Sequence, residues 1–410
     1  MNKPPELLAP AGSLKMARTA FDYGANAIYA GQPRYSLRVR NNEFGDLAKL
    51  GAAIDLAHER GGQCYVVSNI FPRNAKLKTY LADMAPVVAL GPDALIMADP
   101  GLMLMIREAW PAMPIHLSVQ ANTVNHAAVR FWQSVGVSRV ILSRELSLDE
   151  IAEIRQHCPD IELEVFVHGA LCVAYSGRCL LSGYFNHRDP NQGTCTNSCR
   201  WRYRLIEEET RPGELMPIEE DEHGTYILNS KDLRAIEYID RLVAIGVDSL
   251  KIEGRTKSAY YVARTCQAYR QAIDDARAGR GFDARLVAGL DDLANRGYTA
   301  GFFERHPDRE HQNYLSGLSR MGASQYVGDV LGYADGLAEI DVKNRFAVGD
   351  EIEIIHPAGN CRWKIERMEK VSAGGTAGDT SVAPGNGHVV RIPLPAGKAG
   401  AFLARLGSDG

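Results

Sequence analysis

The sequence alternates short apolar runs with amphipathic helical segments through its first 255 or so residues. The strand-length runs are ELLAPA, NAIYAG, QCYVVSN, ALIMAD, IHLSVQA, RVILSRE, LEVFVHG, TYILNS and SLKIEGR. Segments such as SLKMARTAFDYG and NHAAVRFWQSVG lie between most of them, and each closes on a glycine typical of a helix end. Repeated βα units predict an α/β fold, and this number of strands favours a TIM-like barrel with one extra strand over a doubly wound sheet. TYILNS is the doubtful strand, since it follows the acidic stretch EEETRPGELMPIEEDEHG.

The pattern changes after residue 324, where apolar and polar residues alternate with a period of two between Gly, Asn and Pro turns. This part predicts a small all-β barrel domain. We therefore expect a TIM-like barrel over residues 1–280, with a cysteine-cluster insertion at about 170–225. A helical connector over 281–324 and a small C-terminal β-barrel over 325–410 would follow.

Composition narrows the possible compartments and partners. No apolar run is long enough to cross a bilayer, and MNKPPELLAPAGS lacks the features of a secretory signal, so we expect a cytoplasmic protein with no membrane partner. The formal net charge of -4 excludes a strongly basic nucleic-acid binder, although it leaves room for a local basic patch.

Four of the eight cysteines fall close together, directly after the run LEVFVHG. They are Cys172, Cys179, Cys195 and Cys199, separated by six, fifteen and three residues. Residues that follow a barrel strand lie on the functional face, where four thiolates can hold zinc or an iron-sulfur cluster. Only one close pair is present, so the spacing favours the cluster, with zinc and four unrelated buried thiols as alternatives. The other cysteines are expected to be core residues: Cys64, Cys158, Cys266 and Cys361.

Several long motifs resemble a known family. EVFVHGALCVAYSGRCLLSGYFN resembles the signature of the collagenase-like peptidase family U-32, and RDPNQGTCTNSCRW, DEHGTYILNSKDLRAIEYI and SLKIEGRTKSAYYVART resemble its branch of bacterial tRNA hydroxylation proteins. The resemblance implies prephenate-dependent hydroxylation of the tRNA wobble uridine to 5-hydroxyuridine, the first step toward 5-carboxymethoxyuridine. It also implies a 4Fe-4S cluster, with zinc as the lesser alternative. Some relatives carry a ligand cysteine where this chain has Arg234, so Cys199 is expected to supply the fourth thiolate.

Two other functions stay open. The family name suggests a peptidase, but no H-E-x-x-H motif occurs, and a thiolate committed to a cluster cannot pair with His168 as a free nucleophile. A non-catalytic tRNA-binding or cluster-carrier component of a modification complex is the second alternative.

Prephenate as a co-substrate carries two carboxylates, so cations are expected where barrel strands end. The predicted substrate-binding residues at these positions are Arg38, Arg144, Lys251, Glu253 and Arg255, with Arg40 as a further candidate. The alternative for the arginines is a salt bridge at the rim, Arg144 with Glu145 or Arg255 with Glu253.

Three polar residues are candidates for catalysis, namely Gln120 and Asn122 after IHLSV and His168 before the cysteines. Turn formation by Asn122 and a core position for His168 are the alternatives. The stretch RWRYR interleaves cations with aromatics, so Arg200, Trp201 and Arg202 are predicted to bind tRNA through phosphate contacts and base stacking. The outer face of a strand is the alternative there.

Overall fold

The computed structural model describes residues 3–32, 34–37, 42–171, 231–304, 324–371 and 377–407, together with short strands between residues 206 and 226. The chain divides into two compact units. The first comprises Met1–Leu286 and Asn295–Arg320, and the second Val287–Ala294 and Met321–Gly410. Within the described residues, none of the helices has the length and apolar character that a membrane crossing requires.

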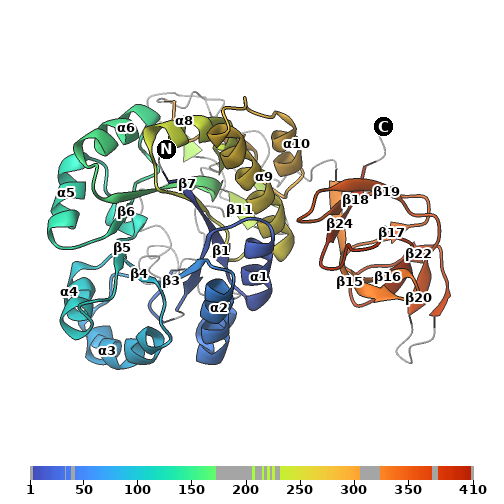
Figure 1. The fold of residues 1–410 in the computed structure, drawn as a ribbon, viewed down its shortest axis with the longest axis horizontal. Helices are drawn as coiled ribbons and strands as arrows, with labels where there is room; N and C mark the ends of the chain where they lie inside the picture. Colours follow the sequence, from blue (N-terminus) through green and yellow to red (C-terminus); the bar gives the residue numbers. More distant parts are fainter. Residues whose placement is uncertain are drawn as a thin grey trace. The chain divides into compact units, whose positions relative to one another are not determined.

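A closed barrel of eight parallel strands forms the first unit, with the helices outside it (Figure 1). The strands are β1 Glu6–Ala11, β2 Ala27–Gly31, β3 Gln63–Ser68, β4 Ala94–Met97, β5 Ile115–Leu117, β6 Arg139–Ile141, β7 Glu162–Ala170 and β13 Ser249–Ile252. Each pairs with the next in the chain, and β13 closes the ring by pairing with both β1 and β7. The predicted TIM-like barrel is confirmed.

The helices of this unit alternate with the strands. They are α1 Leu14–Asp22, α2 Leu47–Glu59, α3 Asn74–Ala89, α4 Pro100–Ala109, α5 His126–Ser134, α6 Leu148–His157, α8 Ile239–Ile245 and α9 Ala259–Arg277. Several begin at a side-chain cap that satisfies an otherwise unpaired backbone N–H. Ser147 shows this most fully, because its hydroxyl caps α6 while Glu150 reaches back to the Ser147 amide.

The described residues of TYILNS, Thr225 and Tyr226, lie outside the barrel sheet. They belong to β11 Gly224–Tyr226, which pairs with β10 Glu219–Asp221 in a separate antiparallel hairpin. Two short strands instead extend the barrel sheet beside β7, namely β12 Asp232–Arg234 and β14 Tyr298–Thr299. Strand β12 runs antiparallel to β7, so it brings Arg234 alongside His168.

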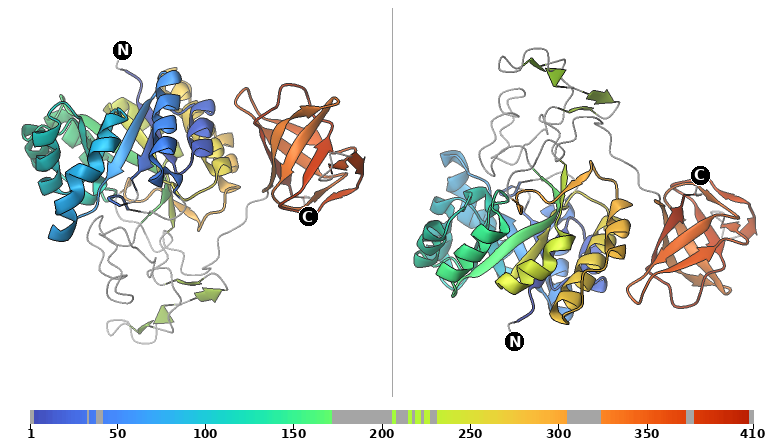
Figure 2. Two further views of the ribbon diagram at one scale, coloured as in Figure 1. Left: turned by 90° about the horizontal axis from the view of Figure 1, so that it is seen from below. Right: turned by 90° about the horizontal axis from the view of Figure 1, so that it is seen from above.

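The second unit is an antiparallel all-β domain, as the sequence predicts, and Figure 2 shows its strands in orange to red. They are β15 Ser324–Ala334, β16 Leu337–Val342, β17 Phe346–Ala347, β18 Glu351–Ile355, β19 Cys361–Lys364, β20 Glu369–Val371, β21 Ala377–Asp379, β22 Val382–Ala383, β23 Val389–Ile392 and β24 Phe402–Leu406. The core consists of alternate strand residues such as Ile340, Ile352 and Ile354. Helix α10, Arg285–Asp291, spans the boundary between the units, and its residues from Val287 onward belong to the second.

Candidate active site at the barrel mouth

The carboxyl ends of the parallel strands all lie at one end of the barrel, here called the mouth. Arg144 follows β6 by three residues and Arg255 follows β13 by three. Strands β6 and β13 are not neighbours, since β7 lies between them. The barrel therefore gathers at its mouth side chains that are more than a hundred positions apart in the sequence.

Three of the predicted cations surround two aromatic rings; we call Arg144, Lys251 and Arg255 the mouth cations. The Arg144 guanidinium lies 3.9 Å from the centre of the Phe166 ring. The Lys251 ammonium is 4.4 Å from the ring centre of Tyr29 and 5.5 Å from that of Phe166, while Arg255 lies 5.8 Å from Tyr29. Each contact is within the range of a cation–π interaction. The structure thus brings together three cations that the sequence placed only at separate strand ends.

The carboxylate beside Arg144 differs from the one that the rim salt-bridge alternative proposed. Arg144 pairs with Glu253, with Nη2 and Oε2 3.7 Å apart. Glu145 instead accepts a hydrogen bond from the Ser143 hydroxyl. Arg144 and Glu253 follow strands that are not adjacent, so their pairing depends on closure of the barrel. It could not be predicted from the residues next to each of them in the sequence. Glu253 thus lies at the mouth as a partner of a cation.

Arg255 is held by the backbone around it. Its Nη2 donates to the carbonyl of Leu37, in the segment after β2. At the end of β2, a Cβ on Gly31 would collide with Nη1 of Arg255, so glycine makes room for the guanidinium. Asn69 supports the same segment, since its Oδ1 accepts from the Leu37 amide at 3.2 Å and its Nδ2 donates to Ser118 Oγ at 3.0 Å. Asn69 was not among the predicted residues, although its position directly after β3 was a usable signal.

Lys251 lies deeper than the arginines and connects the mouth to a group of charges inside the barrel. Its Nζ is 2.7 Å from Glu164 Oε1, and both side chains are almost completely buried. Burial lowers the pKa of Lys251, while the Glu164 carboxylate opposes that shift. Lys251 therefore shares its charge between Glu164 below and the aromatic rings at the mouth.

The sequence analysis missed the rest of this interior ion network, which consists of Glu6, Arg139, Glu164 and Lys251. Arg139 Nη1 lies 2.7 Å from Glu6 and 3.2 Å from Glu164. Strands β1 and β6 are not adjacent, so the contact between Glu6 and Arg139 crosses the barrel interior. Tyr65 adds a hydrogen bond from its hydroxyl to Glu6, at 2.6 Å. Each charged side chain in the network is in direct contact with one of opposite charge.

His168 packs against α9, on the outside of the barrel wall. The pairing of β7 with β13 shifts register between Lys251 and Ile252, and this bulge separates His168 from Phe166, which contacts the mouth cations. The Tyr269 hydroxyl donates to the Val167 carbonyl at 2.7 Å, so it accepts from His168 Nδ1, 3.2 Å away. His168 therefore occupies a core position, with the proton on Nδ1.

The other ring nitrogen of His168 is a buried acceptor. Burial lowers the pKa of His168 to about 3, which makes the ring neutral at pH 7. Among the described residues, no hydrogen-bond partner faces Nε2. In this tautomer Nε2 can accept a hydrogen bond but cannot donate one. A catalytic role for His168 stays a prediction, and in this tautomer that role would be to accept a hydrogen bond at Nε2.

Gln120 and Asn122 lie in the turn after β5. Asn122 adopts a left-handed backbone conformation, with φ of 53°, and its side-chain amide lies 2.9 Å from Ser143 Oγ. Asparagine is one of the few residues that tolerate this conformation, so the turn accounts for its presence. Gln120 is partly exposed in the same turn. Contact of either residue with a substrate remains a prediction.

Several predicted residues lie outside the described part of the chain. They are Arg38, Arg40, Cys172, Cys179, Cys195, Cys199, Arg200, Trp201 and Arg202. The described part of this region ends at Leu171, one residue before the first of these cysteines. Of the remaining cysteines, Cys64, Cys158 and Cys266 are buried and Cys361 is partly exposed.

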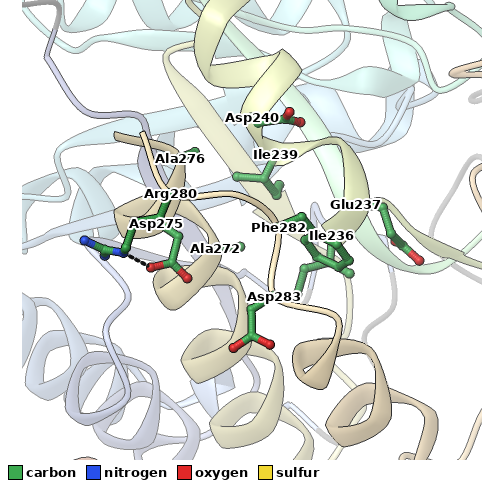
Figure 3. Close-up of a pocket in the computed structure, with 10 residues that line it drawn as sticks. All are labelled: Ile236, Glu237, Ile239, Asp240, Ala272, Asp275, Ala276, Arg280, Phe282 and Asp283. Atoms are coloured by element: carbon green, nitrogen blue, oxygen red, sulfur yellow. Dashed lines mark hydrogen bonds and ion pairs between the residues drawn. The ribbon is translucent and has the colours of Figure 1, made fainter. Parts of the chain in front are cut away.

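One small pocket lies away from the mouth, between α9 and the segment that leads into α8 (Figure 3). Its volume is about 20 Å³, and Ile236, Ala272 and Phe282 form part of its lining. Such a volume holds about one water molecule, which makes it too small for an organic substrate.

An eight-stranded parallel barrel with a cationic mouth defines a TIM-barrel protein whose functional face is built from strand-end residues. Residues 12–313 match Peptidase family U32, and residues 323–405 match the Peptidase family U32 C-terminal domain. The chain belongs to peptidase family U32.

Similar proteins carry names from RNA modification. The chain is 56% identical to tRNA hydroxylation protein P of Escherichia coli, over 95% of this chain and 94% of that protein. It is 54% identical to tRNA hydroxylation protein P of Haemophilus influenzae, over 95% and 93%. It is also 30% identical to the 23S rRNA 5-hydroxycytidine C2501 synthase of Escherichia coli, over 89% of this chain and 54% of that protein.

Proposed function

We propose that this protein is an RNA hydroxylase that converts the wobble uridine of tRNA to 5-hydroxyuridine in the cytoplasm, with prephenate as co-substrate. The names of its relatives support hydroxylation of RNA, since two of them are tRNA hydroxylation proteins and a third is an rRNA hydroxycytidine synthase. The wobble uridine as the target base and prephenate as the co-substrate are the more specific parts of the proposal.

The arrangement of the mouth cations is the observation that supports a dianionic co-substrate. The three mouth cations lie around the rings of Tyr29 and Phe166, so they concentrate positive charge in one part of the mouth. Arg144 is only 12% exposed, and its Nη2 lies 3.7 Å from Glu253 Oε2, beyond direct hydrogen-bond length. A ligand carboxylate that contacted Arg144 would form a charge-assisted hydrogen bond in a poorly solvated site. Prephenate, with two carboxylates, matches more than one of these cations.

The cofactor would be held by Cys172, Cys179, Cys195 and Cys199. Four thiolates are a ligand set for a 4Fe-4S cluster and also for zinc, which is the lesser alternative. The end of β7 supports this location, because Ala170 ends the strand two residues before the first of these cysteines. When bound, the cluster would supply one-electron chemistry beside the mouth.

The tRNA would bind through the segment that follows the last of these cysteines. Arg200 and Arg202 offer phosphate contacts, and Trp201 between them offers a stacking surface for an unpaired base. The overall charge of -4 argues for such a local contact rather than extensive phosphate binding.

The first test is made in cells that lack the native protein and carry the wild-type gene or a variant. We expect wild type to restore 5-hydroxyuridine, measured in tRNA by mass spectrometry, and we expect restoration to require prephenate synthesis. Unmodified tRNA with a well-expressed wild type would reject the proposal. If the protein binds tRNA but purified protein cannot modify it with prephenate, the carrier alternative is favoured. Peptide cleavage that survives loss of the cysteines would favour the peptidase.

A second test concerns the cofactor. Replacing any one of Cys172, Cys179, Cys195 and Cys199 with alanine should abolish iron and acid-labile sulfide in anaerobically purified protein, because each would supply one ligand. Cys266→Ala is the matched control, since this buried cysteine lies in α9, and its iron content should stay at the wild-type value. Stoichiometric zinc without sulfide in wild type would instead establish the zinc alternative.

A further inference from the structure

A second group of metal-binding side chains lies between α5 and α6, on the outer surface of the barrel. His126, Glu153 and His157 each offer one ligand atom, and these atoms all lie within 4.8 Å of one another. Imidazole nitrogens and a carboxylate oxygen are ligands that zinc and other divalent transition metals accept. None of the three takes part in the mouth or in the cysteine cluster.

The fold holds the three residues in place. Glu153 and His157 are four residues apart on α6, so they project from the same face of that helix. His126 is the first residue of α5, which packs against α6. The Cys158 thiol, directly after His157, donates to the main-chain carbonyl of His126 at 3.5 Å and links the two helix ends.

The two imidazole rings are stacked, with centroids 4.3 Å apart and planes inclined by 27°. Stacking leaves the ligand nitrogens of the two rings within 4.8 Å of each other, and imidazole nitrogen is a common zinc ligand. Ligand atoms on one tetrahedral zinc lie about 3.3 Å apart, since each Zn–N distance is about 2.0 to 2.1 Å. The side chains of Glu153 and His157 are exposed and can turn to close the remaining gap.

We propose that His126, Glu153 and His157 form a binding site for a divalent transition-metal ion, with Zn²⁺ as the best match to the ligand set. Three protein ligands leave one coordination position for water or another ligand. The metal would join the start of α5 to the end of α6. This site is independent of the proposed hydroxylation.

Cobalt distinguishes this site from the cysteines, because Co²⁺ bound to thiolate has a sulfur-to-metal charge-transfer band and Co²⁺ bound to imidazole and carboxylate has none. Full-length protein, purified anaerobically, is titrated with Co²⁺ as wild type, His157→Ala and Glu153→Gln. His58→Ala is the control, since His58 is an exposed histidine on α2. Thermal unfolding without metal checks that the variants fold as wild type does.

We expect wild type and His58→Ala to bind one more Co²⁺ than His157→Ala, or to bind it at least about tenfold more tightly, since lost support of a metal ligand costs about 10- to 100-fold in affinity. The difference spectrum between wild type and His157→Ala should lack the charge-transfer band. Zn²⁺ should raise the unfolding temperature of wild type more than that of the variants. Equal binding by wild type, His157→Ala and Glu153→Gln would overturn the proposal, as would a thiolate band in the difference spectrum.

Discussion

Two groups of charges occupy the same barrel, one inside it and one at its mouth, and they are paired in different ways. Inside, Arg139 contacts Glu6 and Glu164 at 2.7 and 3.2 Å. At the mouth, Arg144 and Glu253 stand 3.7 Å apart, and the guanidinium also lies 3.9 Å from the ring centre of Phe166. The interior charges are in direct contact with one another, whereas the Arg144–Glu253 pair at the mouth is more widely spaced.

The difference assigns separate roles to similar residues. A buried charge that loses its partner destabilises the fold, because the remaining partner stays in a poorly solvated site. Arg144 Nη2 lies beyond hydrogen-bond length from Glu253 Oε2, so removal of Arg144 should cost less stability than removal of an interior charge. Substitutions in the interior should therefore act on stability, and those at the mouth on function. Lys251 belongs to both groups, so a substitution of Lys251 would not separate the effect on stability from the effect on function.

The largest effect is expected for Arg139→Met, which leaves Glu6 and Glu164 inside the barrel without their shared cation. Removing one partner of a buried ion pair costs about 3 to 5 kcal/mol. The unfolding free energy, measured by urea denaturation, should fall by about this amount. Arg241→Met is the control, because Arg241 pairs with Asp149 on the surface and an exposed pair contributes about 0 to 1 kcal/mol. Equal losses in the two variants would remove the distinction between the interior network and ordinary surface pairs.

Arg144→Ala should act at the mouth. If Arg144 binds a prephenate carboxylate, its loss costs about 2 to 5 kcal/mol of binding, equivalent to roughly 30-fold or more in the prephenate requirement. The measurement is 5-hydroxyuridine formation against prephenate concentration, beside urea denaturation and tRNA filter binding. tRNA affinity should be unchanged. Arg60→Ala is the control, because Arg60 pairs with Asp22 on the surface at the end of α2. Full modification at the wild-type prephenate concentration would remove Arg144 from the proposed binding site.

Lowering the pH should reduce the stability of the fold, because His168 is buried in its neutral form. In the unfolded chain His168 takes up a proton near pH 6.5, whereas in the folded chain its pKa is about 3. Its contribution to stability is therefore complete above pH 6.5 and is lost as the pH falls toward 3, at about 1.4 kcal/mol per pH unit. His168→Asn, which keeps a donor for Tyr269, should reduce the slope of unfolding free energy between pH 6.5 and 4.5 by about one proton. An unchanged slope would show that His168 does not stay neutral in the folded protein.

The strands were predictable because burial on both faces leaves a continuous apolar run, as in ALIM of β4. Arg144 and Arg255 could also be placed, since every parallel strand ends at the same mouth. Glu164 and Arg139 could not, because a charged residue within a strand pattern usually indicates a solvent-facing position. The pairing of Arg144 with Glu253 and the bulge that turns His168 toward α9 depend on which strands close the barrel, and no local pattern encodes that.

The smallest change in unfolding free energy is expected for replacements of Asn122. The left-handed backbone conformation at this position explains why asparagine occurs there. Glycine adopts positive φ without strain, so Asn122→Gly should change the unfolding free energy by less than about 1 kcal/mol. Asn122→Ala should lose about 1 to 2 kcal/mol, the cost of a left-handed conformation at a residue with a Cβ. We expect the glycine variant to keep forming 5-hydroxyuridine, because the hydrogen bond from the Ser143 amide to the Thr123 carbonyl still positions Ser143 and its neighbour Arg144. A stable glycine variant that forms no product would instead make Asn122 a direct substrate contact, and the mouth would then depend on an amide as well as on its cations.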